Sequence, residues 1–139
     1  MKKVFVDTSY FVALANGRDE FHRQAKAFSD GNIQPTTAIL LELGTKFSRA
    51  DWRSIFLGIL EILEEDDVEI VQIDSSLIGR GIELFRKRPD KHWSLADCIS
   101  FEVMRDHDIT EAVTTDEHFE QAEFIALLRN PGKKDGSRP

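Results

Sequence analysis

The sequence is poor in cysteine, in excess positive charge and in long apolar segments. Cys98 is the single cysteine among 139 residues, so no disulfide can form within the chain, and a reducing compartment such as the cytoplasm is expected. Apolar runs such as 38–41 are far shorter than the roughly 20 residues that span a bilayer. The apolar run before Asp7 is only three residues long (4–6), too short for the apolar part of a signal peptide. We therefore expect a cytoplasmic protein with no membrane partner.

The charge balance is acidic. There are 18 lysines and arginines against 25 aspartates and glutamates, which gives a net charge of −7. A protein that binds nucleic acid through its overall field is basic. Any nucleic-acid binding here must therefore use local basic patches, or metal ions that neutralise acidic side chains. The hydrophobic share of 41% and the chain length fit one globular domain.

Short runs of β-forming residues alternate with amphipathic segments along the chain. We expect strands near 4–6, 33–37, 68–73 and 112–115, with 124–128 as a last strand or an edge segment. We expect helices near 10–14, 19–28, 37–47, 51–63 (with Asp51 as N-cap), 77–85, 94–107 and 116–122. This alternation predicts one α/β domain over about residues 1–130, with helices on both faces of a mainly parallel sheet. Residues 131–139 have the composition of a flexible tail.

Four acidic residues are placed to meet at one edge of this sheet. Ligands of open parallel sheets bind outside the carboxyl ends of the strands. Asp7 follows the first predicted strand and Asp116 follows the strand at 112–115. Asp97 lies in the first turn of the helix before that strand, and Glu42 lies one turn into the helix after the short second strand. All four are candidate site residues.

Each acid also has a purely structural interpretation. Asp7 and Asp116 are placed to act as helix N-caps, and Ser94 with Asp97 resembles a capping box. Glu42 is harder to explain in this way because it interrupts an apolar stretch. If it is buried, its carboxylate must be paired, protonated or bound to metal.

The four acids together favour a metal site over four separate caps. They would repel one another, and their immediate sequence context offers no basic partner. Mg²⁺ and Mn²⁺ prefer oxygen ligands, and the chain lacks the cysteine and histidine pattern of a zinc site. A metal held by acids at an open cleft suits phosphodiester hydrolysis, because it polarises a phosphoryl oxygen and activates water.

The order and spacing of several short motifs resemble the PIN domain, and in particular the VapC-type toxins of type II toxin–antitoxin systems. The motifs are Asp7-Thr8-Ser9 after the first strand, His22 and Ala25, Glu42 within an apolar helix, Ser94-Leu95-Ala96-Asp97, and Thr114-Thr115-Asp116-Glu117-His118-Phe119. The resemblance extends from about Lys3 to Leu128.

This resemblance implies a three-layer, Rossmann-like α/β/α fold and a Mg²⁺- or Mn²⁺-dependent endoribonuclease. It implies an acidic site that consists of Asp7, Glu42, Asp97 and Asp116. Ser94 would support this site, and Thr8 or Thr115 could hydrogen-bond a ligand or its waters. The resemblance also implies an RNA substrate, a cognate antitoxin protein and a homodimer.

A basic cluster precedes His92-Trp93. Arg86, Arg88 and Lys91 could contact phosphate there, with the neighbouring aromatic side chain stacking on a base. The alternative is a solvated helix end, where cations interact favourably with the helix dipole.

Three rival functions remain open from the sequence. A haloacid dehalogenase-type phosphatase needs a second aspartate two residues after Asp7, where this chain has Ser9. An aspartate-phosphorylated receiver needs an acidic pair before Asp7, and that pair is missing. The third rival is a catalytically silent PIN-like scaffold that binds RNA or protein. Loss of metal-dependent cleavage on Asp7→Asn would separate a nuclease from such a scaffold.

Overall fold

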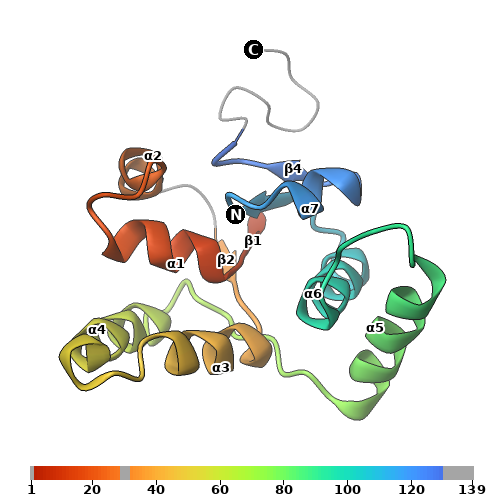
Figure 1. The fold of residues 1–139 in the computed structure, drawn as a ribbon, viewed down its shortest axis with the longest axis horizontal. Coiled ribbons are helices and arrows are strands. Elements are labelled where there is room, and N and C mark those ends of the chain that lie inside the picture. The colour runs from red at the N-terminus through yellow and green to blue at the C-terminus, as the bar shows by residue number, and fades with distance from the viewer. Residues whose placement is uncertain (1, 29–31, 130–139) are drawn as a thin grey trace.

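A parallel four-stranded sheet forms the centre of the computed structural model, which describes residues 2–28 and 32–129 (Figure 1). The strands are β1 (Lys3–Val6), β2 (Asn32–Gln34), β3 (Glu111–Val113) and β4 (Ile125–Ala126), in the order β2-β1-β3-β4. In the register, Val4 of β1 lies opposite Ile33 of β2, and Phe5 lies opposite Ala112 of β3. The carboxyl ends of β1 and β3 therefore lie side by side.

Helices cover both faces of the sheet, with α1 and α2 on one side and α5 and α6 on the other (Figure 1). The helices are α1 (Thr8–Ala15), α2 (His22–Ala27), α3 (Thr37–Lys46), α4 (Arg53–Leu63), α5 (Ser75–Lys87), α6 (Leu95–Asp106) and α7 (Glu117–Gln121), with a 3₁₀ turn at Ala50–Trp52. This arrangement confirms the predicted α/β fold. The tail predicted at 131–139 lies outside the described residues.

Aromatic side chains fix α6 and α7 against the central strand. Phe5 of β1, Phe101 of α6 and Phe119 of α7 are almost fully buried. The ring of Phe119 lies 5.9 Å from that of Phe5 and 5.1 Å from that of Phe101, measured between centroids. Burial of such rings stabilises a core strongly. This packing holds the first turns of α6 and α7 at the same edge of the sheet.

The predicted strand at 68–73 is wrong. Within the described residues this segment makes only two isolated bridges, Ile33 with Val68 and Thr36 with Val71. Its neighbour β2 ends at Gln34, because Pro35 has no backbone N–H to donate and Thr36 caps α3. An edge this short cannot support a continuous ladder.

Two predicted boundaries also differ from the structure. The second strand, expected near 33–37, is Asn32–Gln34 and ends before Pro35. Asp51 is not the N-cap of α4; it lies in the 3₁₀ turn and forms an ion pair with Arg49 at 3.6 Å. The backbone N–H of Trp52 donates to the carbonyl of Arg49 and closes this 3₁₀ turn, and α4 begins at the next residue, Arg53.

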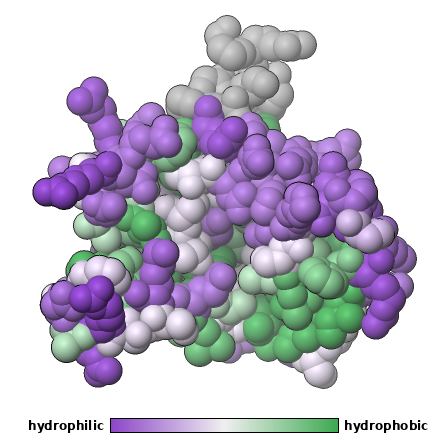
Figure 2. Space-filling view, viewed as in Figure 1, coloured by the Kyte–Doolittle hydropathy of each residue, from purple (hydrophilic) through white to green (hydrophobic). Residues whose placement is uncertain are grey.

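Helices α5 and α6 approach each other closely. Gly81 is buried in α5, and a Cβ atom at this position would lie 2.6 Å from Cγ1 of Ile99 in α6. Arg80 of α5 forms a bidentate ion pair with Asp106 of α6, in which its two guanidinium nitrogens lie 2.8 and 2.6 Å from the two carboxylate oxygens. Apolar side chains gather over α5 (Figure 2), the helix that carries the exposed residues Ile82 and Phe85. None of the helices in the described ranges combines the length and apolar character needed to cross a membrane.

Candidate active site

The four predicted acids line one cleft at the carboxyl edge of the sheet. The cleft has a volume of about 480 Å³. Asp7 follows β1, Glu42 lies on α3, Asp97 lies on α6 and Asp116 precedes α7. Thr8, Ser94 and Thr115 line the same cleft. The structure thus brings together residues from four parts of the chain, and their catalytic role remains a prediction.

Asp7 accepts hydrogen bonds from two hydroxyl groups. Ser9 Oγ lies 2.6 Å from its Oδ1, and Thr114 Oγ1 lies 2.9 Å from its Oδ2. The two hydroxyl oxygens are 3.2 Å apart, and Ser9 Oγ also accepts from the backbone N–H of Thr115. Asp7 occupies the N-cap position of α1 but its side chain makes no capping hydrogen bond. The capping interpretation is therefore wrong for this residue.

The environment of Asp7 favours its protonated form in the absence of metal. The pKa of this carboxyl is raised from 3.8 to about 7, and burial is the largest cause. Within this net shift, the hydrogen bonds from Ser9 and Thr114 lower the pKa, and the charges of Asp116 and Asp97 raise it. A cation in the cleft would relieve this unfavourable burial of charge.

Asp97 is held by the predicted capping box, which the structure confirms. The backbone N–H of Ser94 donates to Asp97 Oδ2, and the backbone N–H of Asp97 donates to Ser94 Oγ, both at 3.0 Å. The same Oδ2 atom lies 2.8 Å from Nδ1 of His118. Capping and a place in the cleft are therefore compatible, because the cap orients the carboxylate.

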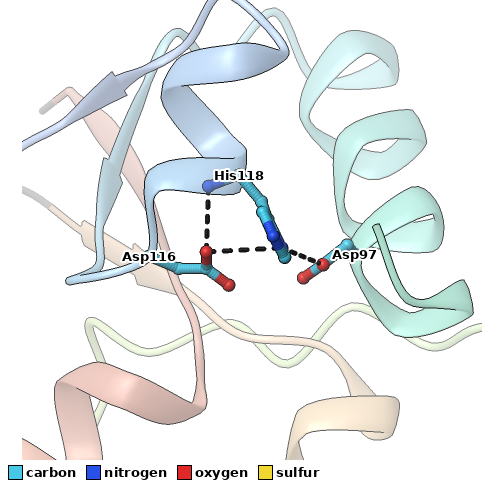
Figure 3. A group of neighbouring side chains, drawn as sticks. All are labelled: Asp97, Asp116 and His118. Atoms are coloured by element: carbon cyan, nitrogen blue, oxygen red, sulfur yellow. Dashed lines mark hydrogen bonds and ion pairs between the residues drawn. The ribbon is translucent and has the colours of Figure 1, made fainter. Parts of the chain in front are cut away.

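Asp116 likewise combines a cap with a place in the cleft. Its Oδ1 accepts a hydrogen bond from the backbone N–H of His118 at 2.9 Å, which confirms the capping interpretation. Its own N–H donates to Thr114 Oγ1 at 3.0 Å. Figure 3 shows the imidazole of His118 between the carboxylates of Asp97 and Asp116. The distance from Nδ1 to Asp116 Oδ1 is 3.4 Å.

Glu42 reaches the cleft from the exposed side of α3. Its side chain is exposed, so the condition of a buried carboxylate does not hold: Ile39, Leu40 and Leu43 pack toward the core, whereas Leu41 is 69% exposed. Glu42 accepts a hydrogen bond from Thr8 Oγ1 at 2.9 Å. Thr8 thus supports an acid of the cleft directly.

The predicted basic cluster lies apart from the cleft lining. Arg86 and Arg88 form ion pairs with Glu83 and Asp90, each at 3.0 Å. Trp93 is only 5% exposed and donates to Gln121, so the suggestion that it stacks on a base is wrong. The cleft is lined instead by two other basic side chains besides His118, namely Lys46 and His92. Substrate binding by Arg86, Arg88 and Lys91 stays a prediction.

Ser9, Thr114 and His118 had no assigned site role from the sequence, where they appeared within the motifs at 7–9 and 114–119. Ser9 and Thr114 orient Asp7, whereas Thr115 contributes its backbone N–H to Ser9. The signal for Thr114 was its place at the end of a strand beside Asp116. The signal for His118 was its place in the first turn of a helix that begins at an acid.

The donor set of the cleft fits a divalent cation. Ligand atoms of Asp97, Asp116 and His118 lie within 4.8 Å of one another. Asp7 and Glu42 add two carboxylates in the same cleft. Oxygen-rich sites of this kind suit Mg²⁺ and Mn²⁺.

Comparison with known proteins agrees with this architecture. A family profile for the PIN domain matches residues 4–125. The chain belongs to the PIN domain family. It is 27% identical over 127 residues to the 23S rRNA-specific endonuclease VapC20 from two strains of Mycobacterium tuberculosis, covering 89% of this chain and 97% of that protein.

Solved structures of other PIN-like proteins show the same fold. The crystal structure of the Mycobacterium tuberculosis VapC20, described as a Sarcin-Ricin loop cleaving toxin, superposes with a TM-score of 0.80 at 26% identity. That match covers 88% of this chain and 96% of the other. FitAcB from Neisseria gonorrhoeae superposes with a TM-score of 0.63 at 14% identity, over 88% of this chain and 94% of the other. The likeness to FitAcB supports the fold alone.

Proposed function

We propose that this PIN domain protein is a metal-dependent endoribonuclease that hydrolyses phosphodiester bonds in RNA. The observation that carries the proposal is the convergence of Asp7, Glu42, Asp97 and Asp116 on one open cleft. Membership in the PIN family favours this function over the receiver and phosphatase alternatives.

The side chains of the cleft have different roles in this proposal. Asp7, Asp97 and Asp116 would hold Mg²⁺ or Mn²⁺, and Glu42 completes the acidic lining from α3. The ion, when bound, supplies a polarised phosphoryl oxygen and an activated water. Ser9 and Thr114 fix the carboxylate of Asp7, and Ser94 fixes that of Asp97. Lys46 and His92 line the cleft where a phosphate backbone would enter.

The first RNA to test is 23S ribosomal RNA. The similar protein VapC20 is named for its action on this RNA. At 27% identity the substrate need not be the same, so a total RNA pool belongs in the same experiment.

The same proposal includes a role as the toxin of a VapBC-type pair. A cognate antitoxin protein would then bind the nuclease, and the nuclease would form a homodimer. The exposed apolar residues Leu41, Leu57 and Phe85 offer surface for such contacts.

Cleavage by purified protein tests the activity. The wild type should cleave RNA with Mn²⁺ or Mg²⁺ and not with EDTA. Asp7→Asn, Asp97→Asn and Asp116→Asn should each remove most of this activity while circular dichroism shows an intact fold. Asp51→Asn is the matched control, because Asp51 is an exposed acid outside the cleft lining.

Two results would contradict the proposal. Full activity in all three cleft variants would mean that the site assignment is wrong. RNA binding without cleavage under every metal condition would instead point to a silent scaffold.

A further inference from the structure

We propose that His118 is a nitrogen ligand of the divalent ion in this cleft and makes the site prefer Mn²⁺ over Mg²⁺. The inference deepens the proposed function and rests on it only in requiring that a divalent ion binds here. The proposal adds one nitrogen donor, the imidazole of His118, to a site that otherwise consists of carboxylates.

The position of the ring matches that of a ligand. Nδ1 of His118 lies 2.8 Å from Asp97 Oδ2 and 3.4 Å from Asp116 Oδ1. In an octahedral site with bonds of about 2.1 Å, neighbouring ligand atoms are roughly 3 Å apart. In the metal-free structure the 2.8 Å contact is a hydrogen bond that Nδ1–H donates to Asp97. Once this nitrogen gives up its proton, it stands at the distance from both carboxylates that one shared ion requires. The imidazole and the two carboxylates point toward one another in Figure 3.

The backbone holds the ring in this position. His118 lies in the first turn of α7, where its N–H donates to the capping carboxylate of Asp116. The next residue, Phe119, is 1% exposed and packs against Phe5 and Phe101 in the core. A ligand fixed by a cap on one side and a core residue on the other needs little reordering to bind an ion.

The chemistry of the donors predicts the metal preference. Mg²⁺ selects oxygen ligands and gives up its water reluctantly. Transition-metal ions accept imidazole more readily, and a site with mixed nitrogen and oxygen donors favours them. Replacement of the imidazole by an amide should therefore reduce Mn²⁺ binding much more than Mg²⁺ binding.

A competing role for His118 leads to the opposite expectation. As a positively charged imidazolium it would only neutralise Asp97 and Asp116 and would have to move away when an ion enters. In that case no nitrogen would bind the metal, and removal of the imidazole would tighten the binding of both ions.

The test uses the full chain at pH 8, where an ordinary imidazole is neutral. Electron spin echo spectroscopy of bound Mn²⁺ detects a directly coordinated nitrogen. Calorimetric titration, with Mg²⁺ as a competitor, gives the ratio of the two affinities. The variant is His118→Gln, and the matched control is His92→Gln, because His92 lines the same cleft outside the group of three ligand residues.

We expect a nitrogen coupling in the wild type and in His92→Gln, and none in His118→Gln. The Mn²⁺ to Mg²⁺ affinity ratio should fall on the order of tenfold in His118→Gln alone. The wild-type spectrum is informative even if His118→Gln does not fold. Bound Mn²⁺ without nitrogen coupling, an unchanged affinity ratio, tighter binding in His118→Gln, or no Mn²⁺ binding would each overturn the proposal.

Failure of the nuclease function would look different. If bound Mn²⁺ shows nitrogen coupling but RNA stays intact, the proposed nuclease function is contradicted and the assignment of His118 as a ligand stands. If RNA is cleaved efficiently but bound Mn²⁺ shows no nitrogen coupling, the nuclease function stands and His118 is not a ligand. Asp97→Asn should weaken Mn²⁺ and Mg²⁺ alike, which separates general loss of the site from loss of its preference.

Discussion

The hydroxyl oxygen of Thr114 lies 2.9 Å from Oδ2 of Asp7, although 107 residues separate the two in the chain. Thr114 follows β3 and Asp7 follows β1, and these strands pair in parallel. A buried threonine after the end of one strand thus orients an acid after the end of its neighbour. The position of Asp7 in the cleft depends on the pairing of the two strands.

Thr114→Val should lower both stability and metal affinity. The substitution removes the hydrogen bond to Asp7 and leaves the N–H of Asp116 without its acceptor. Loss of a partner for a buried polar group costs about 1–3 kcal/mol. Urea unfolding and Mn²⁺ titration would measure the two effects. Thr115→Val is the control for the unfolding measurement, because only the backbone of Thr115 takes part in these hydrogen bonds; an equal loss of stability there would contradict the argument.

The metal-free protein should lose stability as the pH rises from about 4 to 7. The pKa of Asp7 is about 7 in the folded chain and 3.8 ordinarily, so the folded state keeps a proton that the unfolded state releases. Each pKa unit corresponds to about 1.4 kcal/mol, so the loss from this group is at most about 4 kcal/mol. Asp7→Asn has no such proton.

Urea unfolding in EDTA at pH 5 and pH 8 would check this expectation. Asp7→Asn should gain stability relative to the wild type as the pH rises, whereas Asp51→Asn should show no such trend. A pH-independent difference between Asp7→Asn and the wild type would show that Asp7 is already ionised in the folded state.

Protons should compete with metal at Asp7. Since the carboxyl titrates with a pKa of about 7 and metal binds its ionised form, Mn²⁺ affinity should fall about tenfold from pH 8 to pH 6 through this group alone. Calorimetry in buffers of different ionisation enthalpy would count the protons released. Equal affinity at both pH values would exclude the competition.

Gly81→Ala should destabilise the packing of α5 on α6. The added Cβ would meet Ile99 Cγ1 at 2.6 Å and the Ile99 backbone nitrogen at 3.3 Å. Overpacking of this kind costs about 1–3 kcal/mol. Gly79→Ala in the same helix is the control, because its Cβ would enter open space and alanine favours a helix by about 1 kcal/mol. Chemical unfolding should therefore show changes of opposite sign, and a stabilising Gly81→Ala would mean that Ile99 yields easily.

Local patterns in the sequence were sufficient for the parts of the fold that depend on local physics. The buried run after Lys3, the apolar spacing on α3 and the Ser94–Asp97 capping box all operate within a few residues. The order of strands and helices then placed Asp7 and Asp116 at one sheet edge. The local features were predicted because each is encoded within a single element, and the shared edge followed from the general rule for parallel sheets.

The remainder depends on partners far apart in the chain. The alternating pattern at 68–73 is typical of a strand, but the edge available to it ends at Pro35. The hydroxyl of Thr114 becomes a support for Asp7 only after β1 and β3 pair. His118 gains its place between two acids only through the packing of α7 against α6. A single sequence carries no direct signal for such contacts between residues far apart in the chain.

The long separation between Asp7 and Thr114 also has a consequence during protein synthesis. A ribosome makes Asp7 and its neighbour Ser9 long before it makes Thr114, the second residue that orients Asp7. Until β3 has left the exit tunnel and paired with β1, the nascent chain has neither the supported Asp7 nor the helix that carries His118. If the finished protein cuts ribosomal RNA, this chain order keeps the growing polypeptide harmless to the ribosome that makes it.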